Sequence, residues 1–441
     1  MFPRPTSNGM KNHSVFQIAI LIIFGALAIV GVLVFAIAVG GGSGNTVGRV
    51  EIWGTLSEKA FSKYILQISE TDQRFAQVVY LQKDPATYES DLTNALAVGG
   101  GPDIFLLRQD FVIRNAGKVI PFGSILTADQ FRAMYVDAGN LYLIGSSGAL
   151  GLPILVDPLL LYWNKDMLSA ANFAKPPAYW DEITGMAQEM TARADSGSII
   201  KSGVALGEYA NVNNAKDILS ALILQSGGKI TAVDISGRLV PALVAQTGAS
   251  LEATEKALRF FTQFSDSSNV YYSWNRSLKN SRSAFASGDL GLYIGFGSEE
   301  AVIRSMNPNL NFDASPLPQV RDGAQTVGVA RVYALAVSRA SRDSAGSQTI
   351  ASLLASPATG KNISLALGMS SALRDVLAQP AEGIDVLLKR ETLIARSWID
   401  PYPEKTADIF RAMIERVSSG AMLSRDAVQR ANQEMADVLG L

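Results

Sequence analysis

After residue 48, short continuous apolar runs alternate with segments in which apolar residues recur every three to four positions. Short apolar runs at 49–54 ("RVEIWG"), 75–82 ("FAQVVYLQ") and 103–108 ("DIFLLR") predict buried strands. The segments between them, 56–70 and 86–101, repeat their apolar positions every three to four residues and predict amphipathic helices. A strand–helix–strand–helix–strand order implies parallel strands with right-handed crossovers in an open α/β sheet.

This topology also predicts where a ligand would bind. In open α/β sheets, ligands bind beyond the carboxyl ends of the strands, at a point where the strand order reverses. The rule points to residues 54–57, after the first strand, and to residues 108–110, after the third. Both loops are therefore candidate site segments on the basis of topology alone.

The rest of the chain is richer in helices. Periodicity and turn residues predict helices at 179–194, 214–228, 251–266, Glu404–Ser418 and Ser424–Leu439, a strand and a helix within 288–306, and a strand at 331–341.

A long apolar segment near the N-terminus predicts a membrane anchor. At about 1.5 Å per residue, residues 15–39 can span a bilayer of about 30 Å. Basic residues precede the segment and a glycine-rich stretch follows it. The positive-inside bias then predicts a cytoplasmic tail at 1–14, a single-pass anchor at 15–39, a tether at 40–48 and a binding domain outside the cell membrane. A cleaved signal peptide is the alternative, but its apolar core spans only ~7–15 residues.

Composition excludes several classes of function. The chain has 38 basic and 40 acidic residues, so a nucleic-acid partner is not expected. It has no cysteine, and its single histidine, His13, lies in the N-terminal tail. Thiol nucleophiles, serine–histidine–aspartate triads and cysteine or histidine metal sites are therefore excluded, and neither a metal nor a cofactor is expected.

Six segments together resemble the family 1 extracellular solute-binding proteins, which are the maltose-binding-protein-like receptors of ABC importers. They occur in the family's order and extend over the chain from residue 49. The segments are "VEIWG" (50–54), "GGGPDIF" (99–105), "LPILVDPLLLYWNKDML" (152–168), "KPPAYWDEI" (175–183), "AFASGDLGLYI" (284–294) and "YALAVSRAS" (333–341).

The resemblance implies a two-lobed periplasmic-binding-protein-like α/β fold, with a doubly wound sheet in each lobe and a ligand held between the lobes. Lobe 1 would comprise 49–155 and 332–366, and lobe 2 would comprise 156–326 and 368–441. Hinge segments would lie near 151–157, 326–331 and 367–372. The apolar run around Asp157 would then be a strand that crosses between the lobes.

The resemblance also implies a set of ligand-binding residues. Asp157 aligns with a family carboxylate that binds sugar hydroxyls from the hinge, although it could instead accept neighbouring backbone N–H groups and fix the crossing. Asp110 aligns with a second family carboxylate. The adjacent Arg108 could contact a polar ligand in bidentate fashion or pair with Asp110.

Further candidates lie in two loops. Trp53 ends the first strand, where it could stack on a ligand or pack in the core. Thr55 aligns with a polar ligand contact, but Thr55 and Glu58 also form a capping-box pattern, and the sequence favours this second interpretation. Tyr209 and Asn211 occur in "GEYANVNN", where the family presents an aromatic ring and polar groups to the ligand.

The aromatic residues depart from the family pattern. Leu107 and Ser298 stand where maltodextrin binders have tryptophans that stack on sugar rings, so maltodextrin is not the expected ligand. Other aromatic residues could replace them, with Phe296 and Trp398 taken as ligand-binding candidates.

The favoured function is a membrane-anchored receptor that delivers a small polar solute, with a carbohydrate favoured, to the permease of an ABC importer. Such a receptor needs no catalytic residue, and a monomer is expected. Two alternatives are a sensor that signals ligand occupancy to a membrane partner and, with less support, a glycoside hydrolase that uses Asp157 and Asp110.

Overall fold

The computed structural model describes residues 47–144, 148–244, 249–323 and 325–441. The predicted anchor at 15–39 lies outside this described part of the chain. Within the described residues, no helix has both the length and the apolar character needed to cross a bilayer. Residues Gly48–Leu441 form one compact unit.

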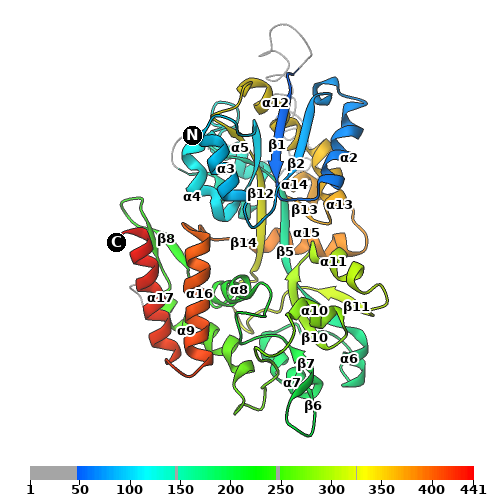
Figure 1. Cartoon of the computed structure of the whole chain (residues 1–441), viewed down its shortest axis with the longest axis vertical. Helices are drawn as coiled ribbons and strands as arrows, with labels where there is room; N and C mark the ends of the chain where they lie inside the picture. Colours follow the sequence, from blue (N-terminus) through cyan, green and yellow to red (C-terminus); the bar gives the residue numbers. More distant parts are fainter. Residues whose placement is uncertain (1–46, 145–147, 245–248, 324) are drawn as a thin grey trace, which may run out of the picture. The chain divides into compact units, whose positions relative to one another are not determined.

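Strands and helices alternate along this unit, with helices dominating its C-terminal part (Figure 1). The strands are β1 (Val50–Gly54), β2 (Val78–Gln82), β3 (Ile104–Arg108), β4 (Val119–Ile120), β5 (Leu152–Asn164), β6 (Ala192–Arg193), β7 (Ile199–Val204), β8 (Thr231–Val233), β9 (Leu239–Pro241), β10 (Leu290–Phe296), β11 (Phe312–Ser315), β12 (Gly328–Ser338), β13 (Ser370–Ser371) and β14 (Ala395–Arg396). The helices are α2 (Glu58–Ser69), α3 (Tyr88–Ala97), α4 (Val112–Asn115), α5 (Ala128–Met134), α6 (Lys165–Ala170), α7 (Trp180–Met190), α8 (Ala215–Gln225), α9 (Ala249–Thr262), α10 (Ser281–Ala286), α11 (Glu299–Met306), α12 (Ser344–Leu354), α13 (Pro357–Leu367), α14 (Arg374–Leu377), α15 (Ile384–Ile394), α16 (Pro403–Ser418) and α17 (Ser424–Leu439).

The first three strands pair as the hydrophobic pattern predicts. β1 runs parallel to β2 on one side and to β3 on the other. The main sheet continues in the order β2-β1-β3-β12-β5-β10-β7-β6. β1 and β3 are apolar and largely buried, as is typical of inner strands of a parallel sheet, and each lies between two other strands. The predicted parallel α/β sheet is confirmed.

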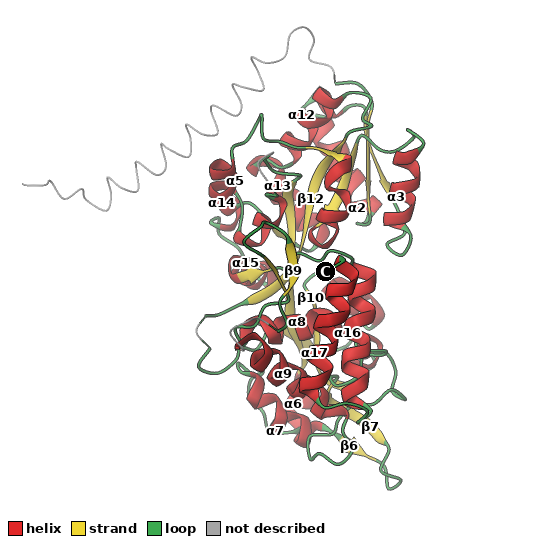
Figure 2. Ribbon diagram, turned by 90° about the vertical axis from the view of Figure 1, so that its left-hand side faces the viewer, coloured by secondary structure: helices red, strands yellow, loops and turns green. Residues whose placement is uncertain are grey.

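Two long strands, β5 and β12, connect the two halves of this sheet (Figures 1 and 2). The first half of β5, up to Pro158, pairs with β12, and its second half pairs with β10 and β11. The predicted hinge segments fall at the start of β5, at the start of β12 and at β13, which pairs with β5 at Val156. The residue bounds assigned to the two lobes stay a prediction.

The second half of the unit is built around a buried apolar core. β10 is fully buried, and α7, α8 and α9 turn their apolar faces toward it. α16 and α17 pack against each other and against α9, which closes one side of this core (Figures 1 and 2). The two predicted C-terminal helices are thereby confirmed almost to the residue.

Close approach of β7 to α7 requires a glycine in the strand. A Cβ on Gly203 would lie 2.6 Å from Ala187 Cα and 2.8 Å from the Ala187 carbonyl oxygen. Both are backbone atoms, so they could move away only if the backbone of α7 shifted. We therefore expect Gly203→Ala to lower the free energy of unfolding by about 2 kcal/mol, as overpacking does in a close-packed core.

The facing helix offers a matched control for this substitution. Gly185 lies in α7, and a Cβ added to it would meet no heavy atom within 4 Å, so Gly185→Ala should stabilise the protein by roughly 1 kcal/mol. Urea unfolding of both variants checks the pair. Equal effects of the two substitutions would contradict the close contact between β7 and α7.

Candidate functional site

A cavity of about 300 Å³ opens at the carboxyl end of β3, the start of α8, the first half of β12 and the segment before α16. Elements from both sides of the crossing strands therefore contribute to it. Its charged lining residues are Arg108, Asp110, Lys216, Asp217, Arg331 and Asp400. Positive and negative groups balance in this set, so the cavity carries strong local charge without a net charge.

Arg108 and Asp110 form a fixed pair at the end of β3. The guanidinium donates to both carboxylate oxygens, with Nε–Oδ1 and Nη2–Oδ2 distances of 2.6 Å. Burial alone would raise the pKa of Asp110, but the Arg108 charge overcomes it and holds this pKa below its usual value. Of the two roles that the sequence left open for Arg108, the structure shows the pairing with Asp110, and both residues line the cavity.

Arg331 brings a second cation into the cavity from β12, an otherwise apolar strand. Its Nη2 donates to Asp217 Oδ2 at 2.9 Å. The guanidinium carbon lies 3.8 Å from the centre of the Phe296 ring, which is fully buried. Phe296 therefore packs against Arg331 and supports it rather than lining the cavity itself.

Lys216, at the start of α8, is the third cation that lines the cavity. Its Nζ donates to Asp400 Oδ2 at 2.5 Å, to Thr406 Oγ1 at 2.7 Å and to the Pro403 carbonyl oxygen at 3.2 Å. Burial raises the pKa of Asp400, and the nearby Lys216 charge opposes that shift. These contacts fix the segment before α16 against α8.

Two uncharged side chains of the lining, Gln109 and Tyr209, make contacts that bear on the site. Gln109 Oε1 accepts a hydrogen bond from the Val332 backbone N–H at 2.7 Å, which ties the loop after β3 to β12. Tyr209, a ligand-binding candidate from the sequence, lines the cavity, and the Arg411 guanidinium lies 5.1 Å from its ring centre. Its neighbour Asn211 does not line the cavity.

Asn211 instead has an internal role. Its Nδ2 donates to the Asn275 and Leu278 carbonyl oxygens, and its Oδ1 accepts from Trp274 Nε1 at 3.0 Å. These bonds hold the loop after β7 in shape and leave the amide little capacity for a ligand.

Trp53 and Thr55 also lie outside the cavity lining. Trp53 is 9% exposed, its Nε1 donates to Glu51 Oε1, and the Lys83 ammonium lies 3.7 Å from the ring centre. The predicted capping box of Thr55 and Glu58 is wrong, because α2 begins at Glu58 and its N-cap is Ser57.

The position of Leu56 explains the shift of this helix start. Tyr80 Oη accepts from the Leu56 N–H at 3.0 Å and donates to the Leu56 carbonyl at 2.9 Å. This clamp keeps the backbone at Leu56 out of the helix, and Ser57, the next residue able to cap, accepts from the Ala60 N–H.

Asp157 is 1% exposed and does not line the cavity. Its Oδ1 accepts from the Ser298 N–H at 2.9 Å and its Oδ2 accepts from the Ser298 hydroxyl at 2.6 Å. Burial raises its pKa to about 6, and the Ser298 bonds partly oppose this. Asp157 thus joins β5 to the turn after β10, and its proposed contact with a ligand stays a prediction.

The two carboxylates of the glycoside-hydrolase alternative are each engaged by another group of the protein. Asp110 faces the cavity in a salt bridge, whereas Asp157 is bonded to Ser298 outside it. The described part of the chain contains no group of His, Cys, Asp or Glu side chains placed to hold a metal ion. The fixed hydrogen-bond donors and acceptors that line the cavity suit a polyhydroxylated solute, because each hydroxyl group can both donate and accept a hydrogen bond.

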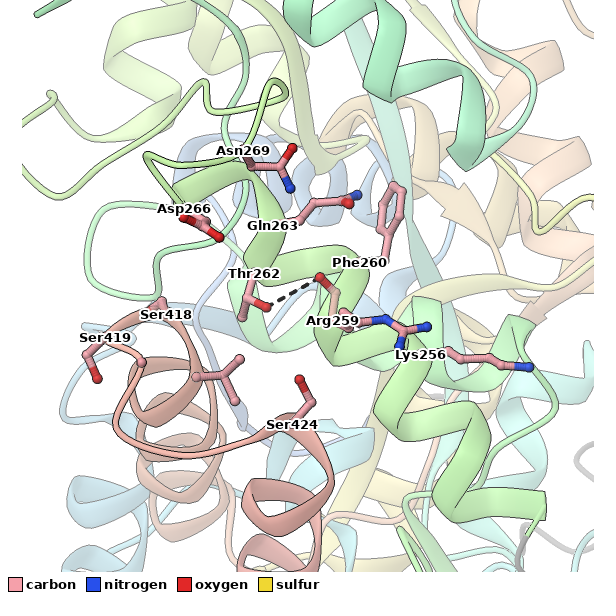
Figure 3. Close-up of a pocket in the computed structure, with 12 residues that line it drawn as sticks. Lys256, Arg259, Phe260, Thr262, Gln263, Asp266, Asn269, Ser418, Ser419 and Ser424 are labelled. Carbon is pink, nitrogen blue, oxygen red and sulfur yellow. Dashed lines mark hydrogen bonds between the residues drawn. The ribbon is translucent and has the colours of Figure 1, made fainter. Parts of the chain in front are cut away.

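A larger hollow, of about 720 Å³, lies between α9 and the turn that joins α16 to α17 (Figure 3). Lys256 and Arg259 extend from α9 on one side, and Ser418 and Ser424 lie on the other (Figure 3). Lys256 is already paired with Glu252 at 2.6 Å. No end of a central strand borders this hollow, so the smaller cavity is the better candidate site.

Four charged residues that line the cavity were not predicted from the sequence, namely Lys216, Asp217, Arg331 and Asp400. A signal existed for Arg331, which is the only charged residue inside the apolar part of its strand. Lys216 and Asp217 lie in the first turn of a helix that follows a strand of the sheet, a position the strand-end rule also covers. Asp400 offered no comparable signal.

Comparison with known proteins adds an independent finding. A family model of bacterial extracellular solute-binding proteins matches residues 67–361, which is more than half of the chain. A curated protein of Brucella abortus, named as a binding protein, is 23% identical over 252 residues, which is 54% of this chain and 55% of that protein. The chain thus spans about half the length of the curated relatives it matches.

Solved structures show the same fold. A solute-binding protein of an ABC transporter from Thermotoga lettingae, bound to α-D-tagatose, aligns with a TM-score of 0.67 at 21% identity and covers 90% of this chain and 100% of its own. The GacH receptor of Streptomyces glaucescens, solved unliganded and with acarbose, aligns with a TM-score of 0.70 at 17% identity, over 90% and 99% of the two chains. At such low sequence identities, the structural similarity shows that this chain has a two-lobed α/β fold, but it does not identify a ligand.

Proposed function

Since the chain belongs to the family of bacterial extracellular solute-binding proteins, we propose that it is the receptor of an ABC importer and binds a small carbohydrate in the cavity between its lobes. We further propose that residues 15–39 anchor it in the cell membrane, with the binding domain outside. Binding without chemical conversion is the proposed activity.

One observation carries this proposal: the charged groups of the cavity are balanced and already fixed by one another. Salt bridges hold Arg108, Arg331 and Lys216 in place before any ligand arrives, so little side-chain entropy is lost on binding. A balanced set of ion pairs favours a neutral polar solute over a highly charged one. A cavity of about 300 Å³ lies at the small end of ligand sites and favours a short saccharide.

The proposed ligand class can be tested by calorimetry on the full chain with saccharides of increasing length, polyamines and short peptides. We expect saturable binding of a mono- or oligosaccharide. The double variant Arg331→Gln/Asp217→Asn should weaken it at least about tenfold, because hydrogen bonds to charged groups contribute ~1.5–3 kcal/mol each.

The second hollow provides the matched control. Lys256 and Glu252 form an exposed pair there, at 2.6 Å, and neither residue lines the smaller cavity. Lys256→Gln/Glu252→Gln removes the same number of charges and should leave saccharide affinity unchanged. Weaker binding in this control, or binding of polyamines or peptides alone, would contradict the proposal.

A further inference from the structure

Trp398 lies next to the cavity without lining it. The indole ring stacks on Phe410, with ring centres 6.2 Å apart and planes 12° apart, and is half-buried against the apolar core. The Lys216 ammonium lies 5.2 Å from the centre of the indole ring. Lys216 itself lines the cavity, so this side chain stands at the boundary between the cavity and the aromatic pair.

Lys216 is held firmly in that position. Its ammonium group has three N–H bonds, and three oxygens, from Asp400, Thr406 and Pro403, accept them. The Lys216 side chain is 17% exposed and that of Asp400 is 2% exposed, so moving the ammonium would leave a buried carboxylate without its cation. A ligand cannot displace Lys216 without breaking this arrangement.

We propose that Lys216 is a specificity-determining residue that covers Trp398 and prevents a saccharide ring from stacking on it. This inference rests on the proposed function, since it concerns which saccharides the same cavity accepts. Phe296, the other replacement aromatic expected from the sequence, provides no stacking surface there, because it is fully buried. The lining itself offers charged and polar groups together with the Tyr209 ring.

Removing the cover should change the ligand range. An exposed indole face binds the apolar face of a sugar ring, as aromatic side chains commonly do. Without Lys216, the cavity would extend to Trp398 and accept a saccharide longer by one ring. The unsubstituted protein should therefore prefer shorter saccharides than a variant without the lysine.

The test uses the full chain and the double variant Lys216→Ala/Asp400→Asn, which removes the ammonium together with the carboxylate it neutralises. Two measurements are made: quenching of Trp398 fluorescence by acrylamide, isolated by comparison with Trp398→Phe in each background, and affinity for saccharides of increasing length. Lys216→Met/Asp400→Asn is the matched control, because the carboxylate is again neutralised and the methionine side chain still covers the ring.

In the double variant we expect acrylamide to quench Trp398 several-fold more strongly than in the unsubstituted protein, and longer saccharides to bind about tenfold more tightly. Adding Trp398→Leu should abolish this gain. In the unsubstituted protein, Trp398→Leu should change affinity less than about twofold. Lys216→Met/Asp400→Asn should show neither stronger quenching of Trp398 nor a gain in affinity for longer saccharides relative to shorter ones.

The outcomes separate this inference from the proposed function. If no saccharide binds to the unsubstituted protein or to any variant, both the proposed function and the inference about Lys216 are overturned. If the unsubstituted protein binds a saccharide but the double variant gains no affinity for longer ones, only the inference is overturned. Should the double variant fail to fold, Trp398→Leu alone decides, because a tenfold loss of affinity would show that the ring already contacts the ligand.

Discussion

Replacing Glu391 with Gln is expected to raise the free energy of unfolding by about 3 kcal/mol at pH 8 and to leave it nearly unchanged at pH 4.5. Glu391 lies in α15, is 1% exposed, and neither of its carboxylate oxygens has a hydrogen-bond partner among the described residues. Burial raises its pKa to about 7, and Arg390, whose Nε lies 3.9 Å from Oε1, only partly opposes this shift.

The direction of the pH dependence follows from proton binding. Because the pKa is higher in the folded than in the unfolded protein, the folded state binds more protons between pH 4.5 and 7. Stability is therefore lost as the pH rises through this range and is lowest above it. A glutamine cannot ionise, so the variant avoids this loss, and each tenfold difference in proton affinity between the two states corresponds to about 1.4 kcal/mol.

Urea unfolding across this pH range measures the effect. The control is Glu382→Gln, which removes an exposed carboxylate a few residues before α15 and should change stability little at either pH. The expected effect is contradicted if the difference in free energy of unfolding between Glu391→Gln and the unsubstituted protein is the same at both pH values. It is also contradicted if the variant is less stable than the unsubstituted protein at pH 8.

Glu391 lies beside the crossing strands, where other polar groups are also unsatisfied. Its Oε2 lies 3.7 Å from the position of a Cβ on Gly328, the first residue of β12. Among the described residues, the hydroxyls of Thr392 in α15 and Ser370 in β13 also lack partners. Buried polar groups of this kind cost stability, so these three side chains each lower the stability of the segments around the crossing.

The sequence predicted the secondary structure well because it depends on local pattern. The predicted strand at 49–54 is β1, the predicted helix at 56–70 is α2 with a later start, and α17 has the predicted bounds. In each case a continuous apolar run or a helical period is visible within a few residues. β5 was recognised as a crossing strand only through the family resemblance.

The cavity was harder to predict because its groups meet through the fold. Arg108 and Asp110 were found from the strand-end rule, since they are close in sequence and lie after β3. Lys216 and Asp400 are far apart in sequence and come together only when α16 packs near α8. A pattern within one segment contains no information about such a contact.

Asp157 is the residue for which sequence and structure suggest different roles. The family resemblance implies a ligand contact, whereas both carboxylate oxygens already accept hydrogen bonds from Ser298. At pH 7.5, above the raised pKa of about 6, we expect Asp157→Ala to lower the free energy of unfolding by about 2 kcal/mol. The reason is that the Ser298 N–H and hydroxyl lose their acceptors.

Asp157→Asn separates the two roles. Asparagine keeps an oxygen that can accept from Ser298 and removes the buried charge, so at pH 7.5 the variant should be at least as stable as the unsubstituted protein. If Asp157 only holds β5 to the turn at Ser298, saccharide affinity measured by calorimetry should change less than about threefold in this variant. A loss of about tenfold or more with unchanged stability would instead establish a ligand contact, because only a bound hydroxyl would then sense the missing charge. The bonds to Ser298 and the position of Asp157 outside the cavity favour the first result.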